Sequence, residues 1–122
     1  MEGQQMIEVY LSPKDVIPQF PSDSELFIVA DNIDDEEYIC RFAEAMLKGG
    51  LRHFDFTGKY CDLWELIFDE TDIKLYPDST SKDVALTMCW RKREDFDEAM
   101  ECSLQEYVYI LYDHSYKQDG KE

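Results

Sequence analysis

The chain of 122 residues carries 12 basic and 28 acidic side chains, a formal net charge of −16 at pH 7, and 44% of its residues are hydrophobic. This size and apolar content suffice for one compact domain, so we expect a single α/β domain over residues 1–122. The acidic field repels nucleic acid and anionic membranes, which excludes both as expected partners, and it attracts basic proteins.

The N-terminal segment, residues 1–24, holds three of the four prolines. Proline lacks the backbone N–H that a strand ladder uses and restricts the residue before it, so we expect a short strand near Met6–Leu11 and then an irregular approach. The apolar run "LFIVA" at 26–30 follows, and its β-forming residues predict a strand covered on both faces.

A strand-to-helix pattern then repeats three times. In the helical segments, apolar residues recur at helical spacing with acidic residues opposite them, and Gly49–Gly50 ends the first helix. Along the second strand, Leu51 and Asp55 are expected on one face and Phe54 on the other. The predicted strands are 25–30, 51–56 and 84–89, and the predicted helices are 35–48, 60–70 and 94–105.

The last element, "EYVYILYD" at 106–113, is ambiguous. It can extend the third helix, whose apolar period it keeps, or form a fourth strand. Its density of aromatic and β-branched residues favours the strand. The pattern predicts a three-layer α/β domain with a parallel or mixed sheet and helices on both faces, followed by a flexible tail at 117–122.

Folds of this class place their binding sites in the crevice at the carboxyl ends of the strands. A ligand site there would be lined by Asp31, Lys59, Cys61, Trp90 and Arg91. Arg91 opens the basic run "RKR" in an otherwise acidic chain. That run can neutralise the acids that follow it, or it can contact an anionic ligand.

Catalytic and metal-binding motifs are scarce. "FTGKYC" lacks the first glycine and the hydroxyl residue of a P-loop, and no calcium-binding loop is present. Asp113, His114 and Ser115 are contiguous, whereas the members of a catalytic triad converge from different elements. We therefore expect no catalytic residue, no metal and no cofactor.

The cysteines form no C-x-x-C pair, so neither a zinc knuckle nor a redox motif is predicted. The thiols of Cys40, Cys61, Cys89 and Cys102 are expected to be reduced and mostly buried. The chain begins with polar and acidic residues instead of a signal peptide, and no apolar run approaches the roughly 18 residues of a membrane span. A cytoplasmic location is predicted, and the oligomeric state stays open.

Two acidic groups begin predicted helices, where the helix dipole favours negative charge. The first is Asp34, Asp35, Glu36 and Glu37, and the second is Glu94, Asp95, Asp97 and Glu98. The dipole explains their position, but the net charge exceeds the magnitude of roughly 2–8 that suffices for solubility. These residues are therefore the expected contacts for a basic partner.

The order of "LFIVADN", "GGLRHFDFTGKYCDLWE" and "ALTMCWRKREDFDEAM" resembles a family of small bacterial proteins grouped as a domain of unknown function, over residues 25–105. The matched positions are Asp31, Gly50, Cys61, Trp64, Thr87 and Trp90. The chain departs from the family pattern at Arg91, where the family has histidine, and at Leu51, where it has cysteine. The family has no established activity, so the resemblance implies the fold and no particular function.

Two functions remain open from the sequence. The first is a small acidic binding protein that neutralises a basic protein partner, as immunity proteins and acidic inhibitors of nucleic-acid enzymes do. The second is a small-ligand sensor or enzyme that uses the strand-end crevice. Charge, size and the scarcity of catalytic motifs favour the first.

Overall fold

The structure is a computed structural model, and it describes residues 5–78 and 84–113. Within these ranges five parallel strands form one sheet in the order β1-β5-β2-β3-β4. The strands are β1 (Gln5–Tyr10), β2 (Ser24–Val29), β3 (His53–Thr57), β4 (Leu86–Cys89) and β5 (Tyr107–Tyr112). The helices are α1 (Glu36–Lys48), α2 (Cys61–Leu75) and α3 (Arg93–Glu101). The predicted α/β fold with a parallel sheet is confirmed, and the predicted tail at 117–122 lies outside the described residues.

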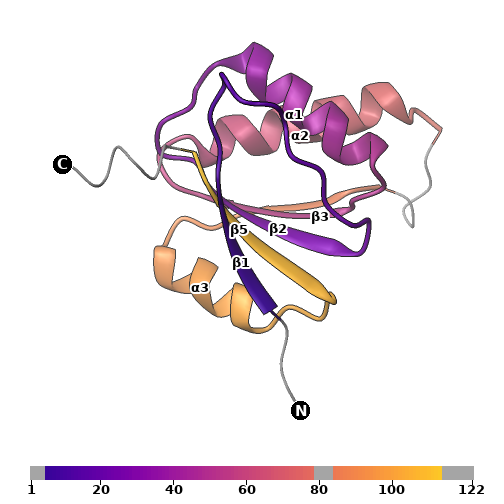
Figure 1. The fold of residues 1–122 in the computed structure, drawn as a ribbon. Coiled ribbons are helices and arrows are strands. Elements are labelled where there is room, and N and C mark those ends of the chain that lie inside the picture. The colour runs from indigo at the N-terminus through magenta and orange to yellow at the C-terminus, as the bar shows by residue number, and fades with distance from the viewer. Residues whose placement is uncertain (1–4, 79–83, 114–122) are drawn as a thin grey trace.

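The helices lie on both faces of the sheet (Figure 1): α1 and α2 cover one face, and α3 lies against the other. From β2 the chain steps outward to β3 and β4 through α1 and α2, and from β4 it returns through α3 to β5, beside β2. Crossovers between parallel strands are right-handed, so an outward step and a return step place their helices on opposite faces. The direction of winding therefore reverses between β2 and β5.

The sheet separates two hydrophobic clusters. The larger joins alternate residues of β2 and β3 to α1 and α2, and it includes Leu26, Ile28, Phe54, Phe56, Phe42, Trp64 and Phe68. The smaller joins the opposite faces of β2 and β5 to α3, through Phe27, Val29, Val108, Ile110, Phe96 and Met100. All five residues of "LFIVA" are buried, which confirms that this strand is covered on both faces.

Helix α1 begins and ends as its sequence predicts. Asp35 is the N-cap, and its Oδ1 accepts hydrogen bonds from the backbone N–H groups of Glu37 (3.0 Å) and Tyr38 (3.2 Å). After the helix, Gly50 adopts a φ of +92°, a left-handed conformation that favours glycine. The apolar residues that recur at helical spacing in this segment are all buried: Ile39, Phe42, Ala43, Met46 and Leu47.

Two helix ends differ from the prediction. Helix α2 runs to Leu75 instead of residue 70. It ends there because Pro77 disfavours the helical conformation of the residue before it, Tyr76. Helix α3 stops at Glu101 instead of residue 105. Ser103 Oγ donates to Glu25 Oε1 (2.6 Å) and accepts from the Gln105 N–H (3.2 Å), which holds a turn where no glycine signals one. Residues 107–112 then form β5, which confirms the strand interpretation.

Two further residue placements follow from the sheet. Leu51 packs in the cluster with α1 and α2, so its predicted position on the Asp55 face is wrong; the strand begins only at His53, and the alternation starts there. Strand β4 lies at the edge of the sheet, where Leu86 is 60% and Met88 is 48% exposed.

No helix in the described part of the chain is long and apolar enough to cross a bilayer.

Candidate functional site

The segments that follow β2 and β3 lie against each other at the carboxyl edge of the sheet. The Lys59 backbone N–H donates to Asp31 Oδ1 (3.0 Å), and the Tyr60 N–H donates to the Ala30 carbonyl (2.7 Å). Gly58, directly before Lys59, has a φ of +100°, and a Cβ at this position would lie 2.5 Å from Asp31 Oδ1. Only glycine fits there, so the backbone itself brings Asp31 to the turn after β3.

The point where the winding reverses, between β2 and β5, is where doubly wound folds hold their ligands. Here Asp113 occupies it. Its Oδ2 accepts from the backbone N–H groups of Asn32 (2.7 Å) and Ile33 (2.7 Å), and its Oδ1 accepts from the Asp31 N–H (3.1 Å) and Asn32 Nδ2 (3.2 Å). Asp113 is 2% exposed. The backbone donors that could bind an external anion are therefore taken by an internal carboxylate.

A small crevice remains beside this point, on the α3 face. It has a volume of about 210 Å³ and is lined by Val29, Asp31, Thr57, Gly58, Arg91 and Arg93. Of the five predicted ligand residues, Asp31 and Arg91 line the crevice, whereas Lys59, Cys61 and Trp90 do not. The cavity is smaller than the roughly 300–1,000 Å³ of typical ligand pockets.

Both arginines of the crevice are in ion pairs. Arg91 donates to Asp62 of α2 (2.6 Å), and this hydrogen bond holds the pKa of the Asp62 carboxyl below its ordinary value. Arg93 pairs with Asp97 one turn along α3 (3.0 Å). Arg93 thus neutralises an acid of its own helix, as one interpretation of the basic run predicted. Arg91 instead joins the segment after β4 to α2. Sequence reasoning missed Arg93 as a lining residue, although it belongs to the same basic run.

Trp90 folds back onto β3. Its indole N–H donates to Asp55 Oδ1 (2.9 Å), and its carbonyl accepts from Thr57 Oγ1 (2.7 Å). Asp55 is 7% exposed, and its burial, together with a hydrogen bond to the Glu25 carboxyl, raises its pKa to about 8. The predicted alternation of β3 places Asp55 on the α3 face. Nothing in the sequence shows that the Glu25 carboxyl of β2, which stands opposite His53, reaches it.

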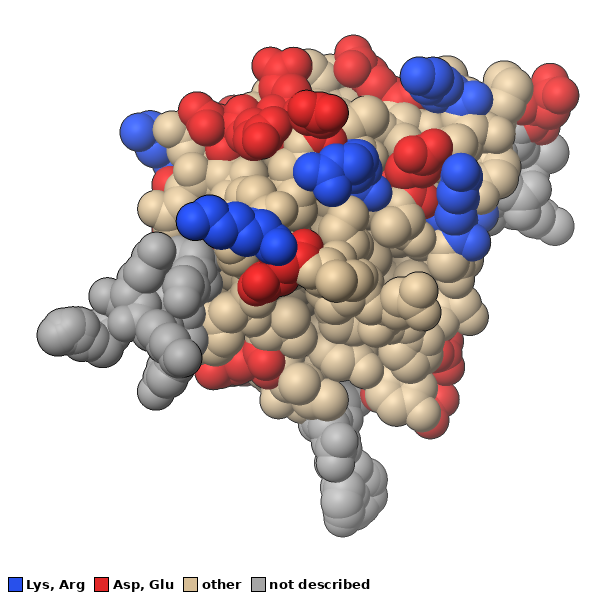
Figure 2. Space-filling view, turned by 45° about the horizontal axis from the view of Figure 1, so that its top comes forward, with Lys and Arg blue, Asp and Glu red and all other residues tan. Residues whose placement is uncertain are grey.

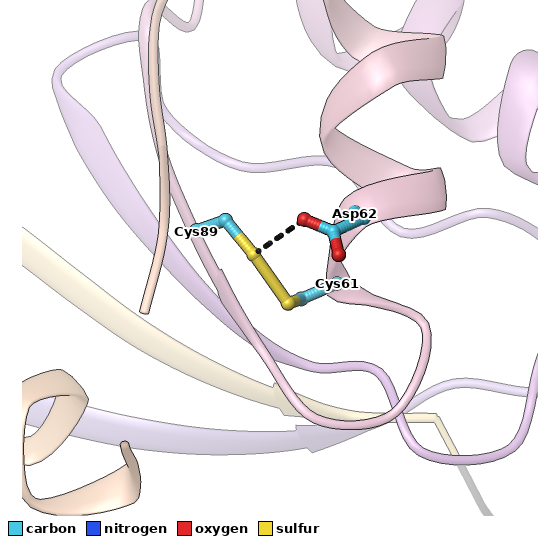
Figure 3. Close-up of side chains that lie close together, drawn as sticks. All are labelled: Cys61, Asp62 and Cys89. Carbon is cyan, nitrogen blue, oxygen red and sulfur yellow. Dashed lines mark hydrogen bonds between the residues drawn. A yellow bond between two sulfur atoms is a disulfide. The ribbon is translucent and has the colours of Figure 1, made fainter. Parts of the chain in front are cut away.

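The expectation of reduced, mostly buried thiols is wrong. Cys61 and Cys89 form a disulfide, and Cys40 and Cys102 are exposed. The pair escaped detection because the two residues are 28 positions apart. Both residues lie at the carboxyl ends of adjacent strands, and this shared position could have indicated the pair. Figure 3 shows the Asp62 carboxylate next to the sulfurs, and Cys61, Asp62 and Cys89 are the possible metal-ligating group in the described ranges.

The two predicted acidic groups lie on opposite sides of the sheet but at the same edge, since α1 and α3 both begin at the carboxyl ends of strands. Asp35 caps α1 and Asp97 pairs with Arg93, so these two serve the fold. The remaining members, Asp34, Glu36, Glu37, Glu94, Asp95 and Glu98, are exposed. Figure 2 shows acidic side chains gathered over the α1 and α2 side, with basic side chains among them.

A third acidic group lies along α2 beside β4. It consists of Asp62, Glu65 and Asp69, and Thr87 Oγ1 donates to Glu65 Oε2 (3.4 Å) and to Asp69 Oδ1 (2.8 Å). Partial burial, with the Asp69 charge nearby, raises the pKa of Glu65. The sequence reasoning did not select this group, although its spacing of three and four residues places it on one helix face.

Comparisons with protein-family models, with curated proteins and with solved structures give no match to this chain.

Proposed function

We propose that this protein binds and neutralises a basic protein partner through the acidic residues at the carboxyl edge of its sheet. The observation that supports the proposal is the set of exposed carboxylates at the starts of α1 and α3: Asp34, Glu36, Glu37, Glu94, Asp95 and Glu98. None of the six forms an ion pair with another residue of the described ranges.

The arrangement favours a cationic partner for a physical reason. Exposed like charges at one edge repel each other, and a basic surface placed against them relieves that repulsion. Of the basic residues at this edge, Arg91 is held by Asp62 and Arg93 by Asp97. The exposed Lys59 and Lys92 are too few to balance the six carboxylates. A partner can therefore be steered by a net negative field, which raises the association rate more than the final affinity.

The role that fits this surface is that of an immunity protein or an inhibitor. Such a protein covers the basic surface with which an enzyme binds its substrate. A nuclease, for example, has a basic surface that binds its polyanionic substrate. The same charge disfavours nucleic acid as a partner. A cytoplasmic location is part of this proposal.

The experiment that tests the proposal is capture of the partner at low salt. The tagged full chain is incubated with an extract of its native cells in buffer of low ionic strength, and the bound proteins are eluted with salt. A basic protein should be recovered by the wild type and lost with Asp34→Asn combined with Glu37→Gln. If no basic protein is recovered, or if the double variant retains it fully, the proposal is wrong.

The alternative is a small-ligand sensor or enzyme that uses the crevice. One observation favours it: Asp31, Arg91 and Arg93 converge on a cavity at the strand ends. The variants Arg91→Ala and Arg93→Ala, both at residues that line the crevice, separate the two functions. If the crevice is the site, each variant should lose the ligand-induced thermal shift or the biological activity. If both variants keep full activity, the function belongs to the acidic surface.

A further inference from the structure

Two cysteines meet at the carboxyl edge of the sheet. Cys61 is the first residue of α2, directly after the turn that ends β3, and Cys89 is the last residue of β4. Because β3 and β4 are neighbouring parallel strands, the two Cα atoms lie 5.9 Å apart, in the range of disulfides. Figure 3 shows the bond between the two sulfurs.

The two sulfurs differ in their surroundings. Cys61 is 3% exposed, and its place in the first turn of α2 puts its sulfur near the backbone N–H groups of the helix start. Cys89 is only partly buried, on an edge strand. An external thiolate can therefore reach Cys89, while negative charge that is released at Cys61 is stabilised by the helix amino terminus.

Asp62 and Arg91 complete the surroundings. Asp62 Oδ1 lies 3.4 Å from Cys89 Sγ, and Asp62 Oδ2 is paired with Arg91 (2.6 Å). Arg91 already occupies one oxygen of the Asp62 carboxylate, and structural zinc sites use four ligands, one more than this group offers. The Asp62 carboxylate beside Cys89 Sγ disfavours a thiolate there, so the negative charge released from the disulfide is favoured at Cys61. The surroundings thus suit a dithiol that cycles with a disulfide better than they suit a metal.

We propose that Cys61 and Cys89 form a redox-active pair that exchanges with an external dithiol. A thiolate of that dithiol attacks Cys89 Sγ, the Cys61–Cys89 bond breaks, and Cys61 leaves as a thiolate. The second thiol of the reductant then attacks its own mixed-disulfide sulfur and releases Cys89, which takes a proton. The external dithiol becomes a disulfide, and two electrons pass to the pair.

The location proposed above supports a reversible role for this pair. In a reducing compartment, disulfides that form are transient and catalytic or redox-sensing, instead of structural. The pair joins the edge strand β4 to α2, and the Arg91–Asp62 ion pair joins the same two segments. The backbone ladder with β3 holds β4 in the sheet after the disulfide opens, so reduction need not unfold the chain.

The test uses the full chain with Cys40→Ser and Cys102→Ser, which removes the two exposed thiols. The chain is equilibrated with dithiothreitol and then with oxidised glutathione, and free thiols are counted by alkylation and mass spectrometry. Circular dichroism monitors folding. We expect two thiols to appear together in the folded chain and to disappear together on oxidation. A disulfide that opens only when the chain unfolds, or thiols that never pair, would overturn the proposal.

Trapping of the mixed disulfide tests which sulfur is attacked. The oxidised chain in the same background reacts with reduced glutathione, acid stops the exchange, and mass spectrometry maps the mixed disulfide. Glutathione should be found on Cys89 about tenfold more often than on Cys61, because Cys89 is the accessible sulfur and Cys61 the better leaving group. Equal amounts on the two cysteines, or more on Cys61, contradict the proposed order. Zinc alone is added to the reduced chain as a further arm. Stoichiometric zinc binding that blocks oxidation would identify a metal site instead and overturn the proposal.

Discussion

The indole N–H of Trp90 donates a 2.9 Å hydrogen bond to Oδ1 of Asp55, a carboxyl group with 7% of its surface exposed. Trp90 therefore closes the α3 face of β3 over an acid that also hydrogen-bonds to the carboxyl group of Glu25. Two carboxyl groups that share one proton in a buried place favour the protonated form of one of them.

This pair predicts a pH dependence of stability. Burial and Glu25 raise the pKa of Asp55 to about 8 from its ordinary value of 3.8, so the folded chain binds a proton that the unfolded chain has lost. The stabilisation is full below the unfolded-state pKa and is lost as the pH rises to about 8, with a slope of at most about 1.4 kcal/mol per pH unit. Urea denaturation at several pH values between 5 and 8 measures it.

Asp55→Asn is the matched control for this prediction. The asparagine oxygen can still accept from Trp90 and its amide can donate to Glu25, but it does not titrate. The difference in unfolding free energy between variant and wild type should grow in favour of the variant as the pH rises. Parallel pH profiles for the two proteins would show that Asp55 is not the titrating group.

Asp113 is predicted to be essential for the segment after β2. Its carboxylate accepts four hydrogen bonds from residues 31–33 in a buried place. Asp113→Ala leaves these donors without their acceptor, and we expect a loss of about 3–5 kcal/mol in unfolding free energy. Asp113→Asn keeps one acceptor oxygen and should lose less. Equal, small losses in both variants, measured by chemical denaturation, would contradict this role.

Asp35 is predicted to stabilise the chain and not to bind the partner. Asp35→Ala removes two hydrogen bonds to the start of α1 and should cost about 1 kcal/mol. Its exposed neighbour Asp34 is the matched control, because Asp34→Ala removes the same charge without removing the cap. A thermal melt should separate the two variants, and indistinguishable melting temperatures would argue against the cap.

Reduction of the Cys61–Cys89 disulfide is predicted to lower stability without abolishing the fold. The bond closes a loop with a sequence separation of 28, and the chain-entropy model assigns about 3.6 kcal/mol to a loop of this length. Urea denaturation with and without dithiothreitol measures the difference. The double variant Cys61→Ser with Cys89→Ser should match the reduced wild type and be insensitive to dithiothreitol; a wild type that is equally insensitive would contradict the prediction.

The sequence predicted the sheet and helices well because their signals are local. The apolar run at 26–30 and the glycines after Lys48 identify elements without knowledge of the rest of the chain. The end of α3 had no such signal, since the turn that follows it depends on Ser103 meeting Glu25, a residue 78 positions away.

The site was predicted less completely because it depends on contacts between distant segments. The strand-end rule selected Asp31 and Arg91, which line the crevice, but it also selected Trp90, whose side chain turns back to Asp55. Neither the Cys61–Cys89 pair nor the position of Asp113 follows from residue spacing, because each joins elements whose neighbourhood is set by the strand order.

The most direct test of the proposed function is the salt dependence of association with the isolated basic partner. Stopped-flow rates are compared for the wild type, for Asp34→Asn with Glu37→Gln, and for Asp23→Asn with Glu106→Gln, which removes the same charge from exposed residues that precede β2 and β5. Exposed charges are screened beyond about 8–10 Å at physiological ionic strength, so the wild-type rate should fall steeply with salt. The first pair should slow association and flatten that dependence more than the second. Equal rates for the two double variants, or a wild-type rate that does not change with salt, would contradict binding through the carboxyl edge.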